Sequence, residues 1–227
     1  MTPILILRPE PGASATAEGA RALGLTPIVA PLFKTAPIDW SAPNSNAFDA
    51  VLMTSANAAR LGGGGLRTLL DLPVHAVGAA TAESAKSAGF RVASIGDQGL
   101  DALLERLDPR LHLLHLAGQN RREPTQSPHR VTVLPVYASS AIPDSEWHPG
   151  KLQNTVALVH SPRAADLFGK RVDERGVHRS AISIAAISEA AAEAAGGGWK
   201  RIEAVSGPTD DALLALAARL CDSTGGE

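Results

Sequence analysis

The stretch Val51–Leu61, VLMTSANAARL, joins a short apolar run to a pattern typical of a helix. The apolar run begins at Ala50 and predicts a buried strand. Ser55 stands where the strand gives way to the helical pattern, and serine is a preferred N-cap because its hydroxyl accepts a hydrogen bond from a free backbone N–H group. A helix starting at Ala56 would follow the carboxyl end of a strand, where open α/β sheets bind ligands.

The same pattern occurs a second time over Ala157–Phe168, ALVHSPRAADLF, where Ser161 takes the place of Ser55, 106 positions later. Two further matches, each 110 positions apart, pair VGAATAESAKSAGF at 77–90 with ISEAAAEAAGGGW at 187–199, and DALL at 101–104 with DALL at 211–214. Strand and helix patterns alternate through both copies. This alternation predicts an α/β protein with two similar parallel-sheet lobes.

The two copies differ in length, which predicts that one lobe is discontinuous. The first copy continues past its DALL run with a strand, a polar segment and another strand, and the second copy lacks these. The N-terminal segment carries a strand, a helix and a strand, and we expect it to complete the C-terminal lobe. The predicted organisation is one lobe of residues 1–35 with 138–227, a second lobe of 40–133, and a two-stranded linker whose proline-rich crossings, 31–48 and 134–150, form a hinge over a cleft.

The opening sequence, MTPILILRPEP, predicts a first strand over Ile4–Leu7 rather than a signal peptide, because its apolar run is short and meets Arg8 at once. Ser14 is the predicted N-cap of a helix that runs to Leu23, and Gly24 would end that helix.

Composition excludes several classes of function. The 227 residues are 44% hydrophobic and 19% charged, as in ordinary soluble proteins. The formal net charge of −2 gives no overall attraction to nucleic acid. Cys221 is the only cysteine, so no internal disulfide can form and a cytoplasmic location is expected. No run approaches the roughly 18 apolar residues that a membrane helix needs. We expect a monomer with no membrane or nucleic-acid partner.

These motifs, in this order, resemble those of the uroporphyrinogen-III synthase family. The resemblance covers nearly the whole chain, and no single motif would be decisive alone. The matching segments are RPEPGASA at 8–15, VLMTSANA at 51–58, VGAATAESAKSAGF at 77–90, LHLAGQNR at 114–121, LPVYAS at 134–139, LVHSPRAAD at 158–166, AAISEAAAEA at 185–194 and PTDDALLAL at 208–216. The family has two α/β lobes joined by a two-stranded ladder, which agrees with the organisation inferred from the repeat.

The resemblance also implies a reaction. The family dehydrates and cyclises hydroxymethylbilane, an open chain of four pyrroles, to uroporphyrinogen III with the last ring inverted. It uses no metal or organic cofactor, and hydroxymethylbilane synthase, which supplies the substrate, is a candidate partner for transfer. Closure without an enzyme gives the uninverted isomer, so the catalyst must control conformation as well as rate.

The implied substrate carries eight carboxylates, whereas the chain is slightly acidic, so local donors must bind them. Free N–H groups at helix N-termini supply such donors and a partial positive charge. The alternative is that the serines at these turns only cap helices. The predicted substrate-binding residues are Arg8, Ser55, Ala56, Gly78, Thr81, Gly118, Ser161, Arg163 and Ser188.

Tyr137, the only tyrosine, is the predicted catalytic residue. The family has an important tyrosine in this VY context, and a phenol of pKa about 10 can donate a proton or a hydrogen bond to a leaving hydroxide. The alternative is a half-buried strand residue on the linker. Thr81 matches a family threonine, but Ala191 stands at the equivalent position of the second copy, where the family often has another.

Several charged and polar residues leave two interpretations open. Arg8 and the pair Arg121-Arg122 lie just beyond equivalent strand ends and could pair with carboxylates or remain solvated. His112 and His115 would point to opposite faces of one strand, which makes them poor metal ligands. The rival class of protein is a non-catalytic, two-lobed cytoplasmic binding or sensor protein for a small molecule, whose fold would look similar.

Overall fold

The computed structural model describes residues 2–97, 99–120 and 128–222. The chain divides into two compact units, each an α/β lobe with its own sheet. Lobe one consists of residues 1–34 and 140–227, and lobe two consists of residues 35–139. Within the described residues, no helix combines the length and the apolar character that crossing a bilayer requires.

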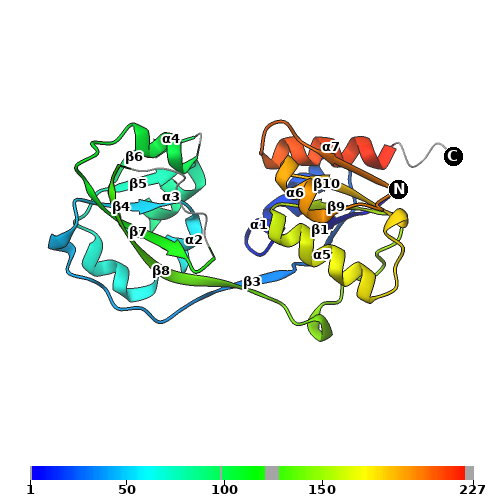
Figure 1. Ribbon diagram of the computed structural model, residues 1–227, viewed down its shortest axis with the longest axis horizontal. Helices are drawn as coiled ribbons and strands as arrows, with labels where there is room; N and C mark the ends of the chain where they lie inside the picture. The colour runs from blue at the N-terminus through cyan, green and yellow to red at the C-terminus, as the bar shows by residue number, and fades with distance from the viewer. Residues whose placement is uncertain (1, 98, 121–127, 223–227) are drawn as a thin grey trace. The chain divides into compact units, whose positions relative to one another are not determined.

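Lobe two is built on a sheet with strand order β3-β8-β7-β4-β5-β6, and the pairs from β8 to β6 are all parallel (Figure 1). Its strands are β3 (Phe33–Pro37), β4 (Ala50–Met53), β5 (Val74–Val77), β6 (Val92–Gly96), β7 (His112–Gly118) and β8 (Arg130–Ala141). Its helices are α2 (Ala56–Leu61), α3 (Ala79–Ser87) and α4 (Leu100–Glu105), with 3-10 turns η1 (Ser45–Ala47) and η2 (Gly63–Leu69).

Lobe one is built on an all-parallel sheet with strand order β11-β10-β9-β1-β2. Its strands are β1 (Ile4–Ile6), β2 (Pro27–Val29), β9 (Thr155–Val159), β10 (Ile182–Ala186) and β11 (Arg201–Ala204). Its helices are α1 (Gly12–Ala22), α5 (Pro162–Glu174), α6 (Glu189–Ala195) and α7 (Asp210–Asp222), with 3-10 turns η3 (Asp144–Glu146) and η4 (Arg179–Ala181).

The two sheets repeat one topology. Reading lobe two as β6-β5-β4-β7-β8 aligns it strand by strand with β11-β10-β9-β1-β2 of lobe one. The N-terminal strand β1 therefore holds the place that β7 holds in the other sheet, with Leu5 paired to Ala157 of β9. The prediction that the N-terminal segment completes the C-terminal lobe is confirmed.

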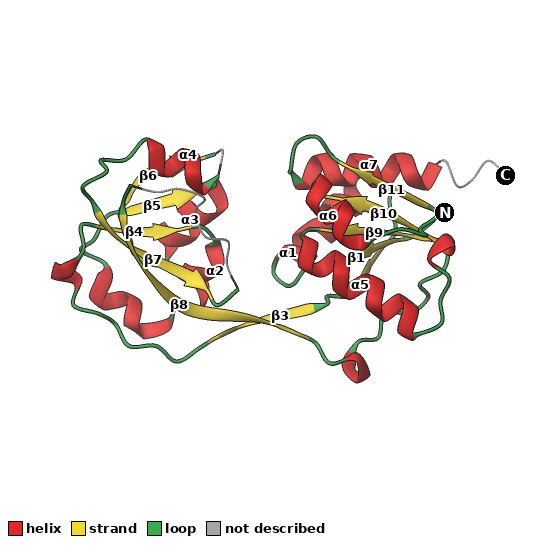
Figure 2. Cartoon of the chain, in the orientation of Figure 1, coloured by secondary structure: helices red, strands yellow, loops and turns green. Residues whose placement is uncertain are grey.

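Apolar residues cover both faces of each sheet, so each lobe is a three-layer α/β structure (Figure 2). In lobe one, α5 and α6 pack on one face through a cluster that contains Phe168, while α1 and α7 pack on the other face. The ring of Phe168 stacks on that of Trp199 with centroids 5.6 Å apart. In lobe two, α2 and α3 cover one face and α4 covers the other.

The chain passes between the lobes along β3 and β8. Backbone hydrogen bonds join Ile142 to Leu32 and Ile38 to Val136, so the two segments run antiparallel. The crossings are thus paired strands, as the sequence predicts, and their action as a hinge stays a prediction.

One predicted helix start is wrong. Helix α1 begins at Gly12 after Pro11, and Ser14 lies inside its first turn and caps nothing. The carboxylate of Glu10 does the capping instead: it accepts hydrogen bonds from the backbone N–H of Ser14 at 3.0 Å and from its hydroxyl at 2.9 Å. A carboxylate next to a helix N-terminus is also favoured by the helix dipole.

Candidate functional site

The strand β4 of lobe two ends in two hydroxyl residues that have separate tasks. Ser55 is the N-cap of α2, and its Oγ accepts a hydrogen bond from the backbone N–H of Asn57 at 3.2 Å. Thr54 pairs instead with the buried His115 of β7, Oγ1 to Nε2 at 3.1 Å. Ala56, the first residue of α2, is half-buried beside this cap. The predicted cap and helix start are both confirmed.

The next turn along the same sheet edge belongs to Gly78, which follows β5 and precedes α3. Its φ of +84° is a conformation that favours glycine, and its backbone N–H donates to the carbonyl of Gly96 at 2.6 Å. Thr81 lies in the first turn of α3 with only 5% of its surface exposed. Its hydroxyl is therefore packed in the lobe and offers little surface to a ligand.

Gly118 and Tyr137 meet where β7 ends and β8 continues. They are partners in the parallel β7–β8 register, at a point where that register shifts. A Cβ on Gly118 would come within 2.8 Å of Cζ and 2.9 Å of the phenol oxygen of Tyr137, so the ring lies directly on the glycine. The Tyr137 side chain also packs against the cluster that includes Val136 and Met53. Gly118 is buried beneath it.

Lobe one repeats the capped turns. Ser161 caps α5, with its Oγ accepting from the backbone N–H of Ala164 at 3.2 Å, and Pro162 occupies the first helical position. Ser188 caps α6 in the same way, accepting from the backbone N–H of Ala191 at 3.3 Å. Each cap follows a parallel strand, so both lie at the carboxyl edge of the sheet.

Arg163 lies in the first turn of α5 and is exposed. Its guanidinium stands over the ring of Phe33, 4.3 Å from the centroid, which is within the range of a cation–π contact. Packing against the ring restrains the guanidinium, while the residue as a whole stays exposed.

Arg8 follows β1 and joins a polar cluster that sequence reasoning missed. Its Nη1 donates to Oδ1 of Asp210 at 3.1 Å and to Oγ1 of Thr16 at 3.3 Å. The hydroxyl of Thr16 donates to Oδ2 of Asp210 at 2.7 Å, and Nε2 of His160 lies 2.9 Å from Oδ1. The four residues come from the ends of β1 and β9 and from α1 and α7 of one lobe.

The electrostatics of this cluster stabilise an ionised Asp210. Burial alone would raise the pKa of the Asp210 carboxyl. Hydrogen bonds from His160 and Thr16, with the charge of Arg8 nearby, outweigh that effect and lower the pKa below its usual value. Asp210 and Arg8 are 202 positions apart, so no local motif could reveal the pair; the sequence hint was only an acidic residue at the start of a helix.

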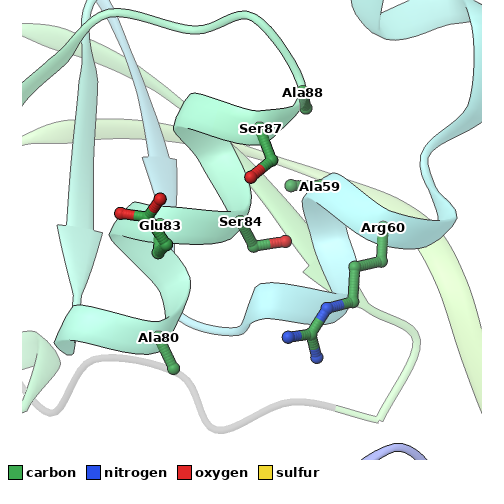
Figure 3. A pocket seen from close by; sticks show the side chains of 7 residues that line it. All are labelled: Ala59, Arg60, Ala80, Glu83, Ser84, Ser87 and Ala88. Carbon is green, nitrogen blue, oxygen red and sulfur yellow. The ribbon is translucent and has the colours of Figure 1, made fainter.

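Arg121 and Arg122 lie outside the described residues. Within the part of the chain that the structure describes, no group of three or more His, Cys, Asp or Glu side chains could hold a metal ion. A groove of about 450 Å³ runs between α2 and α3, lined by Arg60, Glu83, Ser84 and neighbouring small residues, and contains none of the predicted site residues (Figure 3).

The chain is therefore a two-lobed α/β protein in which the predicted binding residues lie at, or just after, the carboxyl ends of strands within each lobe. A direct comparison with curated protein sequences finds no match. Among solved structures, the uroporphyrinogen-III synthetase of Helicobacter pylori 26695 superposes with a TM-score of 0.66 at 16% identity, over 97% of this chain and all of that one. A mutant uroporphyrinogen III synthase of Thermus thermophilus gives a TM-score of 0.53 at 16% identity, over 97% of this chain and 99% of that one.

These likenesses concern the fold. The family model described as uroporphyrinogen-III synthase HemD matches residues 14–215 of the sequence. The chain belongs to the uroporphyrinogen-III synthase family, the cyclising lyases of tetrapyrrole biosynthesis. The resemblance inferred from the motifs is confirmed, and the rival interpretation as a sensor protein is not favoured.

Proposed function

We propose that this protein binds hydroxymethylbilane at the strand ends described above, eliminates water from it and closes it to uroporphyrinogen III, with Tyr137 assisting departure of the hydroxyl. Family membership supports the reaction. The observation that supports the placement is that both sheets end in the same series of turns, with serine caps at Ser55, Ser161 and Ser188 and a glycine at Gly78.

The carboxylates of the substrate are bound by many weak donors rather than by a few strong ones. Backbone N–H groups at the turns of each sheet edge supply hydrogen bonds without adding net charge, and Arg8 and Arg163 add positive charge in lobe one. Sharing the eight carboxylates among such donors holds a flexible chain in one conformation, which is what ring inversion demands.

Tyr137 acts at the step that breaks the C–O bond. Departure of hydroxide from the hydroxymethyl carbon leaves a cation delocalised over an electron-rich pyrrole, so the leaving oxygen needs only a hydrogen bond or a proton. A phenol fixed against Gly118 offers a donor whose position is set by the backbone. Gly118 supports the phenol from beneath, and the buried Thr81 lies in the first turn of the helix that follows Gly78.

The proposal also covers the location of the protein, its oligomeric state and the source of its substrate. The protein works in the cytoplasm as a monomer, and hydroxymethylbilane reaches it from hydroxymethylbilane synthase, either through solution or by transfer. Proximity of the two enzymes would be an advantage, because spontaneous closure of the free bilane yields the wrong isomer.

The decisive experiment follows the isomer ratio. Hydroxymethylbilane is generated in place by hydroxymethylbilane synthase, with and without this protein, and the products are oxidised to porphyrins and separated by chromatography. The expected result is mainly type III with the protein and type I without it. A product distribution unaffected by the protein, at concentrations where an octacarboxylate porphyrin still binds, would favour a binding or sensor function instead.

A further inference from the structure

The polar cluster around Arg8 carries an inference that rests on the proposed function and deepens it. The guanidinium of Arg8 lies at the carboxyl edge of the lobe-one sheet with 34% of its side chain exposed. Only its Nη1 is engaged, by Asp210 and Thr16. Among the described residues, Nε and Nη2 of Arg8 have no acceptor.

Arg179, an arginine of the same lobe, is bonded differently. The guanidinium of Arg179 uses all three of its nitrogens, with Nε and Nη2 on the carboxylate of Asp173 and Nη1 on the carbonyls of Ala195 and Gly197. Arg8 is held by one nitrogen only, so two donors of its planar fork remain for a carboxylate from outside.

The restraint on Arg8 is rigid because both carboxylate oxygens of Asp210 accept hydrogen bonds. Oδ1 accepts from Arg8 and from His160, and Oδ2 accepts from the fully buried Thr16. Thr16 in turn accepts from Arg8 while donating to Asp210, which closes a ring of three hydrogen bonds. Such a closed network has few alternative arrangements.

His160 completes the restraint without reaching a ligand itself. Its side chain is only 11% exposed, and Nδ1 is buried without a hydrogen-bond partner among the described residues. A proton on Nε2, donated to Asp210, leaves Nδ1 as a bare lone pair, which avoids burying an unsatisfied N–H group. The imidazole therefore orients the carboxylate of Asp210 rather than acting on substrate.

We propose that Asp210, oriented by His160 and Thr16, is a positioning residue that holds Arg8 by Nη1 so that its Nε and Nη2 bind one carboxylate of the substrate. Asp210 also balances the charge of Arg8. The contact with substrate is then a specific fork of hydrogen bonds rather than a strong ionic bond, which allows a product with eight carboxylates to leave.

A double-mutant cycle tests the proposal, with steady-state rates of uroporphyrinogen III formation as the readout. Arg8→Lys keeps the charge but loses the fork, and it should raise KM about tenfold with kcat little changed. Asp210→Asn keeps the shape but loses the charge, and it should raise KM about threefold to tenfold. In the double variant, KM should equal that of Arg8→Lys alone within about twofold, because Asp210 acts through Arg8.

Asp211→Asn is the matched control, since it removes the same charge from the first turn of α7 at an exposed residue that is not hydrogen-bonded to Arg8. It should leave KM unchanged. The affinity for an octacarboxylate porphyrin, measured through the fluorescence of the porphyrin, gives a second readout. The dissociation constants of the variants should follow the same pattern as their KM values. Melting curves check the fold, and if Asp210→Asn does not fold, the near-isosteric Thr16→Val replaces it in the cycle.

Several outcomes would overturn the proposal. If the increases in KM caused by the two single substitutions multiply in the double variant, Asp210 acts independently of Arg8 and has only a structural role. A lower KM in Asp210→Asn would mean that Asp210 competes with the substrate carboxylate for Arg8. A wild-type protein that forms no type III isomer defeats the proposed function itself, whereas an active wild type with an additive cycle defeats only the role of Asp210.

Discussion

The phenol of Tyr137 rests on Gly118, because the backbone of β7 at this position carries no side chain and the aromatic ring of β8 fills the space. Even a methyl group on Gly118 would come within 2.8 Å of Cζ. A candidate catalytic hydroxyl in a two-lobed protein thus takes its position from one lobe alone, from two neighbouring parallel strands at the level where one of them ends.

Gly118→Ala should therefore displace the phenol. The added methyl forces the ring to rotate away, since real Cβ contacts are not this short, and overpacking of this kind costs roughly 1–3 kcal/mol of stability. We expect formation of type III isomer to slow about as much as in a variant lacking the hydroxyl. Gly64→Ala, where nothing lies within 4 Å of the new Cβ, is the control in the same lobe. A wild-type rate for Gly118→Ala would show that activity does not depend on the position that Gly118 gives the phenol.

Tyr137→Phe keeps the ring packing and removes only the hydroxyl. General-acid assistance contributes roughly 10²–10⁴-fold to a rate, so type III formation should slow within that range while porphyrin affinity stays near the wild-type value. The spontaneous closure then takes a larger share, and the type I isomer should rise. Chromatography of the oxidised porphyrins measures both, and a melting curve confirms the fold. If rate and ratio are unchanged, Tyr137 is a packing residue and the proton comes from elsewhere.

Ser161→Ala tests whether binding is distributed. Losing the cap of α5 should lower the free energy of unfolding by about 1 kcal/mol, as N-cap replacements commonly do. The rate should fall less than about tenfold, because one of many shared donors is perturbed and its backbone N–H remains. Ser188→Ala in the same lobe should show the same small loss of stability and of rate. Loss of all activity in a folded Ser161→Ala protein would mean that a single turn dominates substrate binding.

The sequence repeat was sufficient to predict the sheets, because matching offsets of 106 and 110 positions place equivalent strands and turns in both copies. It also predicted that the N-terminal segment completes the C-terminal lobe, since each copy needs the same number of elements. Local capping was less predictable. Ser14 fits the N-cap pattern, yet the helix begins two residues earlier and Glu10, outside the helix, accepts from the N–H of Ser14 itself.

Individual side-chain contacts between distant segments were beyond sequence reasoning. Ser55, Ser161 and Tyr137 carry local signals, whereas the partners of Arg8 come from residues 16, 160 and 210 and meet only when the sheet forms. The contact between Gly118 and Tyr137 was likewise not predicted. A glycine before a polar segment indicates a turn, and only the β7–β8 register shows that Tyr137 is its partner.

The lowered pKa of Asp210 predicts how stability depends on pH. A carboxyl whose pKa is depressed in the folded state contributes stability above its unfolded value, and this is lost as pH falls through the folded value. Asp210→Asn should therefore be less stable than wild type at pH 7, by about 1.5–3 kcal/mol for hydrogen bonds to a charged group. Denaturant unfolding from pH 7 down to below about pH 4 should show the difference shrinking. A difference that stays constant across this range contradicts the ionised network.

Gly12 offers a separate way to move Arg8. The guanidinium lies against the first residue of α1, where a Cβ would stand 2.5 Å from Nε and 2.8 Å from Nη2. The φ of Gly12 is not in the left-handed region, and alanine is the better helix former, so Gly12→Ala costs the backbone nothing. The methyl can be accommodated only if the two nitrogens that we assign to the substrate carboxylate shift.

Gly12→Ala should accordingly raise KM for hydroxymethylbilane by about the tenfold expected of Arg8→Lys, with kcat and the melting temperature close to wild type. Gly197→Ala, in the same lobe with nothing within 4 Å of the new Cβ, should leave both parameters unchanged. Combining Gly12→Ala with Arg8→Lys should raise KM little beyond the value of either single variant, since both substitutions act on the contact between Arg8 and the substrate carboxylate. An unchanged KM in Gly12→Ala would mean that Arg8 binds substrate through another edge, or not at all. A fall in kcat with KM constant would place Arg8 in the chemical step rather than in binding.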